Sequence, residues 1–83
     1  MKEYKYMIFL EEPSKTKTKV FSVNNKLSFN LLGYVKWYAP WRKYCFFVDC
    51  PHLVFDAGCL ADIQDFINNL MAERKGVNHA DKH

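Results

Sequence analysis

The C-terminal third of the chain carries apolar residues at helical spacing, and this pattern limits the fold more than any other. Asp56 is a good N-cap residue, and Gly76 is a natural helix stop. We therefore predict one amphipathic helix from about Asp56 to Lys75, followed by a flexible tail over residues 77–83. The apolar stripe of this helix consists of Leu60, Ile63, Phe66, Ile67, Leu70 and Met71.

The part of the chain before this helix favours strands, because branched and aromatic residues alternate with polar ones between turn signals. Pro13-Ser14 and Asn24–Lys26 are turn signals, whereas Leu27–Gly33 is ambiguous, with Gly33 suggesting a bulge or bend. The four predicted strands are Tyr4–Glu12, Lys15–Asn25, Gly33–Tyr38 and Arg42–Val48.

These elements predict an α+β fold: a four-stranded antiparallel sheet with one C-terminal helix packed on one face, in the order ββββα. The single domain spans residues 1–76. Because one helix covers only one face of a sheet, the other face either meets water or binds something.

The last two strands form a predicted hairpin around Pro40, which suits position i+1 of a type I turn. In this register the pairs are Trp37 with Tyr44, Val35 with Phe46, Tyr38 with Lys43, Lys36 with Cys45, and Tyr34 with Phe47. Alternation then separates an apolar face from an amphipathic face. The apolar face holds Val35, Trp37, Tyr44 and Phe46, and the amphipathic face holds Tyr34, Lys36, Tyr38 and Lys43.

The predicted core joins the apolar hairpin face to the helix stripe. A compact core is plausible for 83 residues because 17% of them are aromatic. The residues expected to be buried are Trp37, Tyr44, Phe46, Leu60, Ile63, Phe66, Ile67 and Leu70.

Composition gives weaker indications about location and partners. The net charge of +3 and the pI near 8.8 lean slightly toward anionic partners. The three cysteines are an odd number and no secretory signal precedes them, so we expect a reduced cytoplasmic protein with free thiols. No apolar run approaches the length of a membrane span, and no membrane partner is expected.

Cys45, Cys50, His52 and Cys59 lie within fifteen residues and raise the question of a metal site. Their spacing, C-x4-C-x-H-x6-C, lacks the C-x2-C pairs of structural zinc sites. Free cysteines are often small core residues, and we favour that role over metal binding.

Catalytic patterns are weak. Cys59 near a helix N-terminus and His52 would form a nucleophile and base, but Cys59 precedes the apolar stripe and is expected to be buried. Solvation explains the acidic residues Glu11, Glu12, Asp62 and Asp65. With three glycines in the chain, no phosphate loop or other cofactor motif is present, and we expect a non-enzymatic protein without a cofactor.

The remaining candidate is a basic and aromatic surface. Exposed rings stack on bases, and lysine or arginine neutralises phosphates, which is how single strands are held. Purely structural roles also stay open for these residue types, because lysines on an edge strand prevent aggregation and aromatic residues in strands pack in cores. The candidate binding residues are Lys36, Tyr38, Trp41, Arg42 and Lys43 of the hairpin, extended by Lys15, Lys17 and Lys19 of the second strand.

The segment "LGYVKWYAPWRKYCFF" and the later "VFDAGCLADIQDFINNLM" resemble a family of short proteins from phages, prophages and other mobile elements. The matching pattern is L-G-x-[IV]-x-W-Y-x-x-W-R-x-Y-x-F, then V-F-x-x-x-C-L-x-x-I-x-x-F-I. In this chain Val48-Asp49-Cys50 separates the paired Phe from Pro51, where relatives have Pro directly. The matching residues are Leu32, Gly33, Val35, Trp37, Tyr38, Trp41, Arg42, Tyr44, Phe46, Val54, Phe55, Cys59, Leu60, Ile63, Phe66 and Ile67.

This resemblance implies a phage-like origin and carries no catalytic residue. Our first expectation for the ligand is nucleic acid or a nucleotide. The alternative is a counter-defence inhibitor, similar in role to anti-CRISPR proteins, that docks on a host protein through Trp41 and its neighbours. A DNA mimic would be acidic, and this chain is basic.

Overall fold

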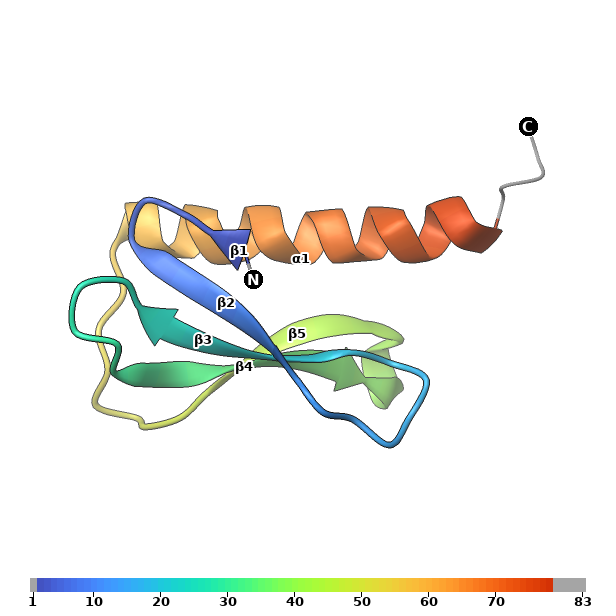
Figure 1. Ribbon diagram of the computed structural model, residues 1–83, viewed down its shortest axis with the longest axis horizontal. Coiled ribbons are helices and arrows are strands. Elements are labelled where there is room, and N and C mark those ends of the chain that lie inside the picture. Colours follow the sequence, from blue (N-terminus) through green and yellow to red (C-terminus); the bar gives the residue numbers. More distant parts are fainter. Residues whose placement is uncertain (1, 79–83) are drawn as a thin grey trace.

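The computed structural model describes residues 2–78, with side chains through residue 74 (Figure 1). All neighbouring strands are antiparallel, and the sheet order follows the chain. The predicted α+β class is confirmed, with five strands in place of four. The elements are β1 (Lys2–Glu3), β2 (Met7–Glu12), β3 (Val20–Asn25), β4 (Leu31–Tyr38), the 3-10 turn η1 (Ala39–Trp41), β5 (Lys43–Val48) and α1 (Ala57–Asn78).

The first predicted strand, Tyr4–Glu12, starts too early, since β2 begins at Met7 and a further short strand, β1, precedes it. The chain reverses between Glu3 and Met7. The backbone N–H of Tyr4 donates to the carbonyl of Met7 at 2.8 Å. The hydroxyl of Tyr4 donates to Oδ2 of Asp65 at 2.6 Å, and the backbone N–H of Tyr6 donates to Oδ2 of Asp62 at 3.1 Å. Burial first, and then this bond to Asp65, raise the pKa of Tyr4 to about 12. Two helix carboxylates therefore hold the β1–β2 turn.

The second predicted strand starts too early, since β3 begins at Val20 and not at Lys15. Residues 13–19 form a loop in which hydroxyl groups bond to one another and to the backbone. The Ser14 and Thr16 side chains lie 3.0 Å apart, and both donate to the carbonyl of Thr18. Local side-chain bonds of this kind compete with strand pairing.

The hairpin register is confirmed at every predicted pair. The backbone N–H of Arg42 donates to the carbonyl of Ala39 at 3.0 Å, as expected for the turn around Pro40, and Arg42 adopts a left-handed conformation with φ of 54°. In β4, a bulge next to Gly33 shifts the pairing with β3. Gly33 is needed there, because a Cβ would lie 2.2 Å from the carbonyl oxygen of Phe47.

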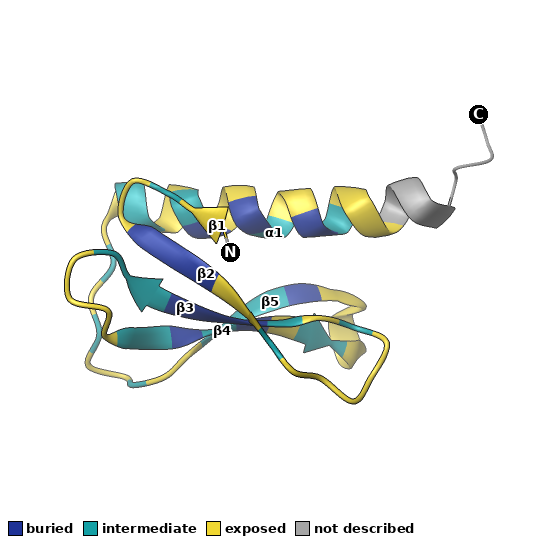
Figure 2. Ribbon diagram, in the orientation of Figure 1, coloured by how far each residue is buried: buried dark blue, intermediate teal, exposed yellow. Residues whose placement is uncertain are grey.

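The core lies between α1 and one face of the sheet (Figure 1), and Figure 2 shows buried positions on both the strands and the helix. Burial is confirmed for four of the predicted residues, Tyr44, Ile63, Phe66 and Leu70. Trp37, Phe46 and Ile67 are half-buried against this cluster. The rest of the core comes from strands, namely Met7, Phe9, Phe21, Val23 and Val35.

The prediction for Leu60 is wrong, because this side chain is 54% exposed. Successive helix residues are rotated by about 100°, and Leu60 therefore lies at the flank of the stripe that Ile63 and Phe66 centre on the sheet. The N-cap is as predicted, since Oδ1 of Asp56 accepts the N–H of Cys59 at 2.9 Å.

The C-terminal end of the helix differs from the prediction, because α1 continues past Gly76 to Asn78. The predicted tail over residues 77–83 therefore overlaps the helix by two residues, and residues 79–83 lie outside the described part. No helix within residues 2–78 combines the length and the apolar character that a membrane crossing needs.

Candidate functional site

One face of the sheet is turned away from α1, and we call it the open face (Figure 1). Alternation along the strands decides its members, because the intervening residues point into the core. The strand pairing places the following residues on the open face: Ile8, Leu10, Glu12, Val20, Ser22, Asn24, Tyr34, Lys36, Tyr38, Lys43, Cys45 and Phe47.

Three aromatic rings gather where the open face meets the hairpin tip. The Tyr38 ring stands edge-to-face against Trp41, with centroids 5.0 Å apart, and against Phe47, with centroids 5.9 Å apart. Tyr38 and Phe47 are half-buried, whereas Trp41 is 65% exposed. We call Tyr38, Trp41 and Phe47 the stacking cluster. Its contacts hold the Trp41 indole in place while leaving much of that side chain open to solvent.

Positive charges border the stacking cluster. The Nζ atom of Lys36 lies 4.7 Å from the centroid of the Phe47 ring, a cation–π geometry. Lys36, Arg42 and Lys43 are all exposed. Within the described side chains, the ion pairs are Lys19 with Glu73 and Lys26 with Glu3. Neither pair involves Lys36, Arg42 or Lys43, so the charges of these three side chains are available to a ligand.

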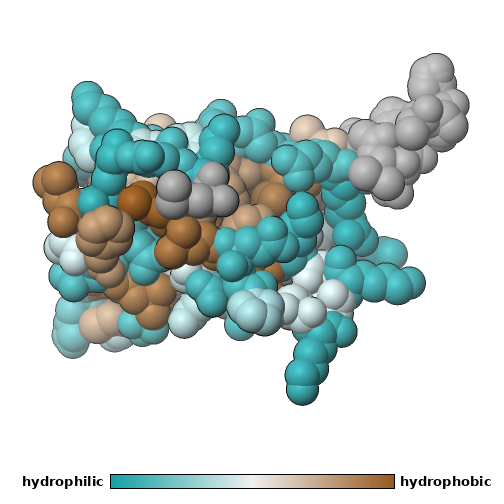
Figure 3. All heavy atoms as spheres, in the orientation of Figure 1, coloured by the Kyte–Doolittle hydropathy of each residue, from teal (hydrophilic) through white to brown (hydrophobic). Residues whose placement is uncertain are grey.

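The structure divides the three loop lysines that the sequence grouped together. Lys15 and Lys17 are exposed in the β2–β3 loop, at the end of the sheet where the hairpin also lies (Figure 1). Hydrophilic side chains project from this end in Figure 3. Lys19 is on the helix side instead: its N–H donates to the hydroxyl of Tyr44 at 3.1 Å, and its Nζ lies 4.0 Å from Oε1 of Glu73.

Five predicted residues therefore form one surface, with Lys15 and Lys17 at the same end of the sheet and Lys19 apart from them. The five are Lys36, Tyr38, Trp41, Arg42 and Lys43. The predicted surface lacked Phe47, although the alternation of β5 already placed it opposite Tyr34 on this face.

A polar network on the open face was missed by the sequence reasoning. The Ser22 hydroxyl donates to Oε2 of Glu12 at 2.8 Å, and the amide of Asn24 donates to Ser22 Oγ at 3.1 Å. Ser22 is buried, with 6% of its surface exposed. The sequence predicted that Glu12 is a solvated residue beside a turn. Its carboxylate instead accepts a hydrogen bond from Ser22 on the neighbouring strand β3.

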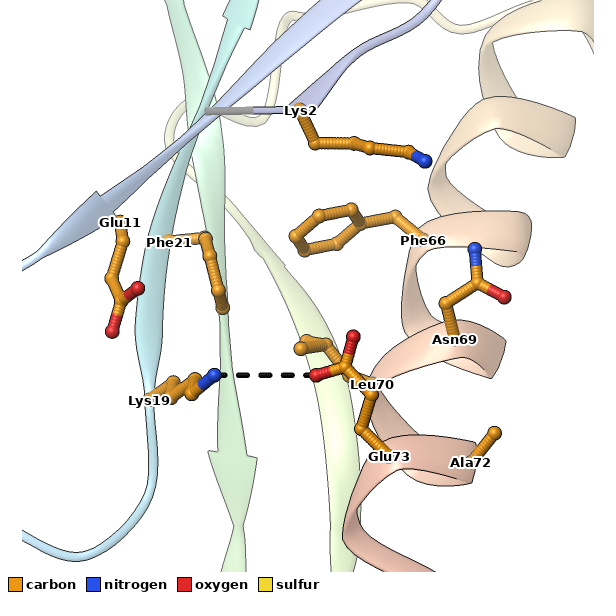
Figure 4. A pocket seen from close by; sticks show the side chains of 9 residues that line it. All are labelled: Lys2, Glu11, Lys19, Phe21, Phe66, Asn69, Leu70, Ala72 and Glu73. Carbon is orange, nitrogen blue, oxygen red and sulfur yellow. Dashed lines mark ion pairs between the residues drawn. The ribbon is translucent and has the colours of Figure 1, made fainter. Parts of the chain in front are cut away.

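A groove of about 530 Å³ opens on the helix side of the sheet, near Lys2 (Figure 4). Its floor is apolar, and the pair between Lys19 and Glu73 bridges it. The groove does not include any residue of the stacking cluster. The lining residues are Lys2, Glu11, Lys19, Phe21, Phe66, Asn69, Leu70, Ala72 and Glu73.

The three cysteines are free and half-buried. Among the residues that the structure describes, no three His, Cys, Asp or Glu side chains lie close enough to hold an ion. Burial, together with a hydrogen bond to Asp56, raises the pKa of the Cys59 thiol. This residue therefore stays protonated at neutral pH.

Comparison with known proteins places the chain in a phage-associated family. It is 41% identical over 73 residues to an uncharacterised 9.3 kDa protein of Acholeplasma phage L2, and the match covers 88% of this chain and 91% of the phage protein. The chain belongs to the same family of short proteins as this relative. No family model matches the sequence. No solved structure matches it either.

Proposed function

We propose that this protein is a non-enzymatic binding module of phage or mobile-element origin, which acts in the cytoplasm and binds single-stranded nucleic acid or a nucleotide. The observation that carries the proposal is the stacking cluster, with Lys36 held over its Phe47 ring and Trp41 largely exposed. Aromatic rings of this kind accept bases regardless of sequence, and neighbouring cations neutralise the phosphates.

The shape of the surface supports a single strand over a duplex. The rings lie on and beside an exposed sheet face, and Arg42 and Lys43 follow at the hairpin tip. A base stacks on a ring only when it is unpaired, which a duplex prevents without extrusion. Lys15 and Lys17 in the adjacent loop would meet phosphates further along the strand.

Fluorescence anisotropy with labelled 12-mer single strands, compared with a duplex of the same sequence, tests the proposal. Stacking on one ring contributes about 1–3 kcal/mol, so Trp41→Ala should weaken binding by about fivefold to a hundredfold. Phe29→Ala is the matched control, because this ring is 66% exposed but lies in the β3–β4 turn. It should leave the affinity unchanged.

Salt dependence separates the aromatic contribution from the ionic one. Each phosphate neutralised on a single strand contributes about −0.7 to the slope of log K against log salt concentration. Lys36→Ala should therefore flatten the slope by about 0.7, while Trp41→Ala lowers the affinity at an unchanged slope. If both variants bind as the wild type does, the open face is not the binding site.

A pull-down from host lysate, with and without nuclease, distinguishes the alternative. A partner that survives nuclease treatment and high salt, yet is lost with Trp41→Ala, would point to docking on a host protein. A partner released by nuclease would support nucleic-acid binding.

A further inference from the structure

The open face carries one carboxylate among its aromatic and basic side chains, that of Glu12. This carboxylate would repel a phosphate, so its position on a surface for nucleic acid calls for a reason. It is half-buried, and its Oε2 accepts a hydrogen bond from Ser22 at 2.8 Å. Ser22 is in turn oriented by Asn24 at 3.1 Å. The three residues form a network that fixes the carboxylate in one orientation.

The network lies beside an aromatic residue. Ser22 is the cross-strand partner of Tyr34, which in turn pairs with Phe47 of the stacking cluster. Opposite residues on one face of a sheet have Cβ atoms about 5 Å apart, and diagonal neighbours lie about 7–8 Å apart. Glu12 lies on β2, diagonal to Ser22, and its carboxylate reaches the Ser22 hydroxyl. A base that stacks on Tyr34 and extends over Ser22 would therefore bring its edge to the Glu12 carboxylate.

The chemistry of a carboxylate selects among the bases. The Glu12 carboxylate only accepts hydrogen bonds, and in the described part of the chain Ser22 supplies the one donor that it receives, which leaves Oε1 and the second lone pair of Oε2 open to a ligand. Guanine presents two donors side by side, N1–H and the N2 amino group. Adenine and cytosine place an acceptor next to their amino donor, and uracil places its N3–H between two carbonyls.

We infer that Glu12 reads guanine, with Ser22 and Asn24 as positioning residues and Tyr34 as the stacking platform. This inference rests on the proposed function and adds a base preference to it. A bidentate contact to the correct base discriminates by about tenfold or more in affinity. Hydrogen bonds to the Watson–Crick edges of unpaired bases are a common mode of sequence recognition on single strands.

The experiment measures the affinity of the protein for labelled decauridylate carrying one central guanosine, inosine or adenosine. Inosine lacks only the N2 amino group, so it is the matched ligand control. The guanosine strand should bind about tenfold tighter than the other two. GMP alone is a further arm, which separates a free nucleotide from a strand as the source of the base.

Glu12→Gln should reduce the guanosine preference to within twofold, because an amide offers one acceptor and a donor in place of two acceptors. Its carbonyl still accepts from Ser22, so the fold is kept. Glu11→Gln is the control variant, since Glu11 is the neighbouring carboxylate but lines the groove on the helix side. It should retain the preference. Ser22→Ala, which frees the carboxylate, should lower the preference without altering binding to decauridylate.

The failures of the two proposals are distinguishable. If the oligonucleotides bind through Trp41 but guanosine and inosine bind equally, or if Glu12→Gln keeps the preference, the guanine inference is wrong and the proposed function stands. If neither the strands nor GMP bind, both are wrong.

Discussion

Phe66→Ala tests whether the core is organised around one helix residue. Phe66 is 5% exposed and stacks on Phe9 with centroids 4.0 Å apart and an interplanar angle of 12°. It also meets Phe21 edge-to-face at 4.8 Å. Truncating a buried Phe costs about 3–5 kcal/mol, and the two ring contacts place this site toward the upper end of that range.

This loss is large relative to the whole domain, since a chain of this size is stable by about 4–12 kcal/mol. Urea unfolding followed by circular dichroism should show a midpoint lowered by at least about 2 M, for a slope near 1 kcal/mol per molar. Leu60→Ala on the same helix is the control. Because Leu60 is 54% exposed, this change should lower stability by less than about 1 kcal/mol.

Two results would refute the reasoning. Equal midpoint shifts for Phe66→Ala and Leu60→Ala would mean that the helix presents a different side to the sheet. A shift below about 1 kcal/mol for Phe66→Ala alone would mean that the aromatic stack does not form a packed core.

Further predictions concern single groups. Gly33→Ala should lower the urea midpoint sharply, because the added Cβ would collide with the backbone. Gly58→Ala should leave the urea midpoint nearly unchanged. Its Cβ would lie 2.7 Å from the movable ring of Tyr6, and alanine favours the helix more than glycine does. The raised pKa of Tyr4 means that the bond to Asp65 stabilises the fold fully below pH 10 and is lost as the pH rises toward 12. The stability difference between the wild type and Tyr4→Phe should therefore shrink at pH 11; a constant difference would contradict this.

The alternation of side chains along the strands determined more of the fold than any other feature of the sequence. A side chain in a strand points to one face or the other whatever the neighbouring strand is. The division of the hairpin into an apolar and an amphipathic face therefore followed from the residue order alone. Its register was also predicted, because Pro40 restricts where the chain turns. The N-cap at Asp56 is equally local, as its carboxylate bonds to an N–H three residues later.

Contacts between distant segments decided what the sequence could not. The strand predicted from Tyr4 begins only at Met7, because Asp62 and Asp65, some sixty residues further on, hold the turn around Tyr4. The loop over residues 13–19 is a local exception: it alternates Lys with Thr as a strand would, but its hydroxyl groups bond to one another and to the carbonyl of Thr18.

In the candidate site, too, some residues could be predicted from the sequence and others depended on contacts across the sheet. Exposed rings and cations at the hairpin tip could be predicted, since they share one short segment. Glu12 could not, because its orientation depends on Ser22 of the next strand and on the sheet face that α1 leaves open. A side chain's neighbours along the chain give its local geometry, whereas its neighbours across the sheet exist only after folding.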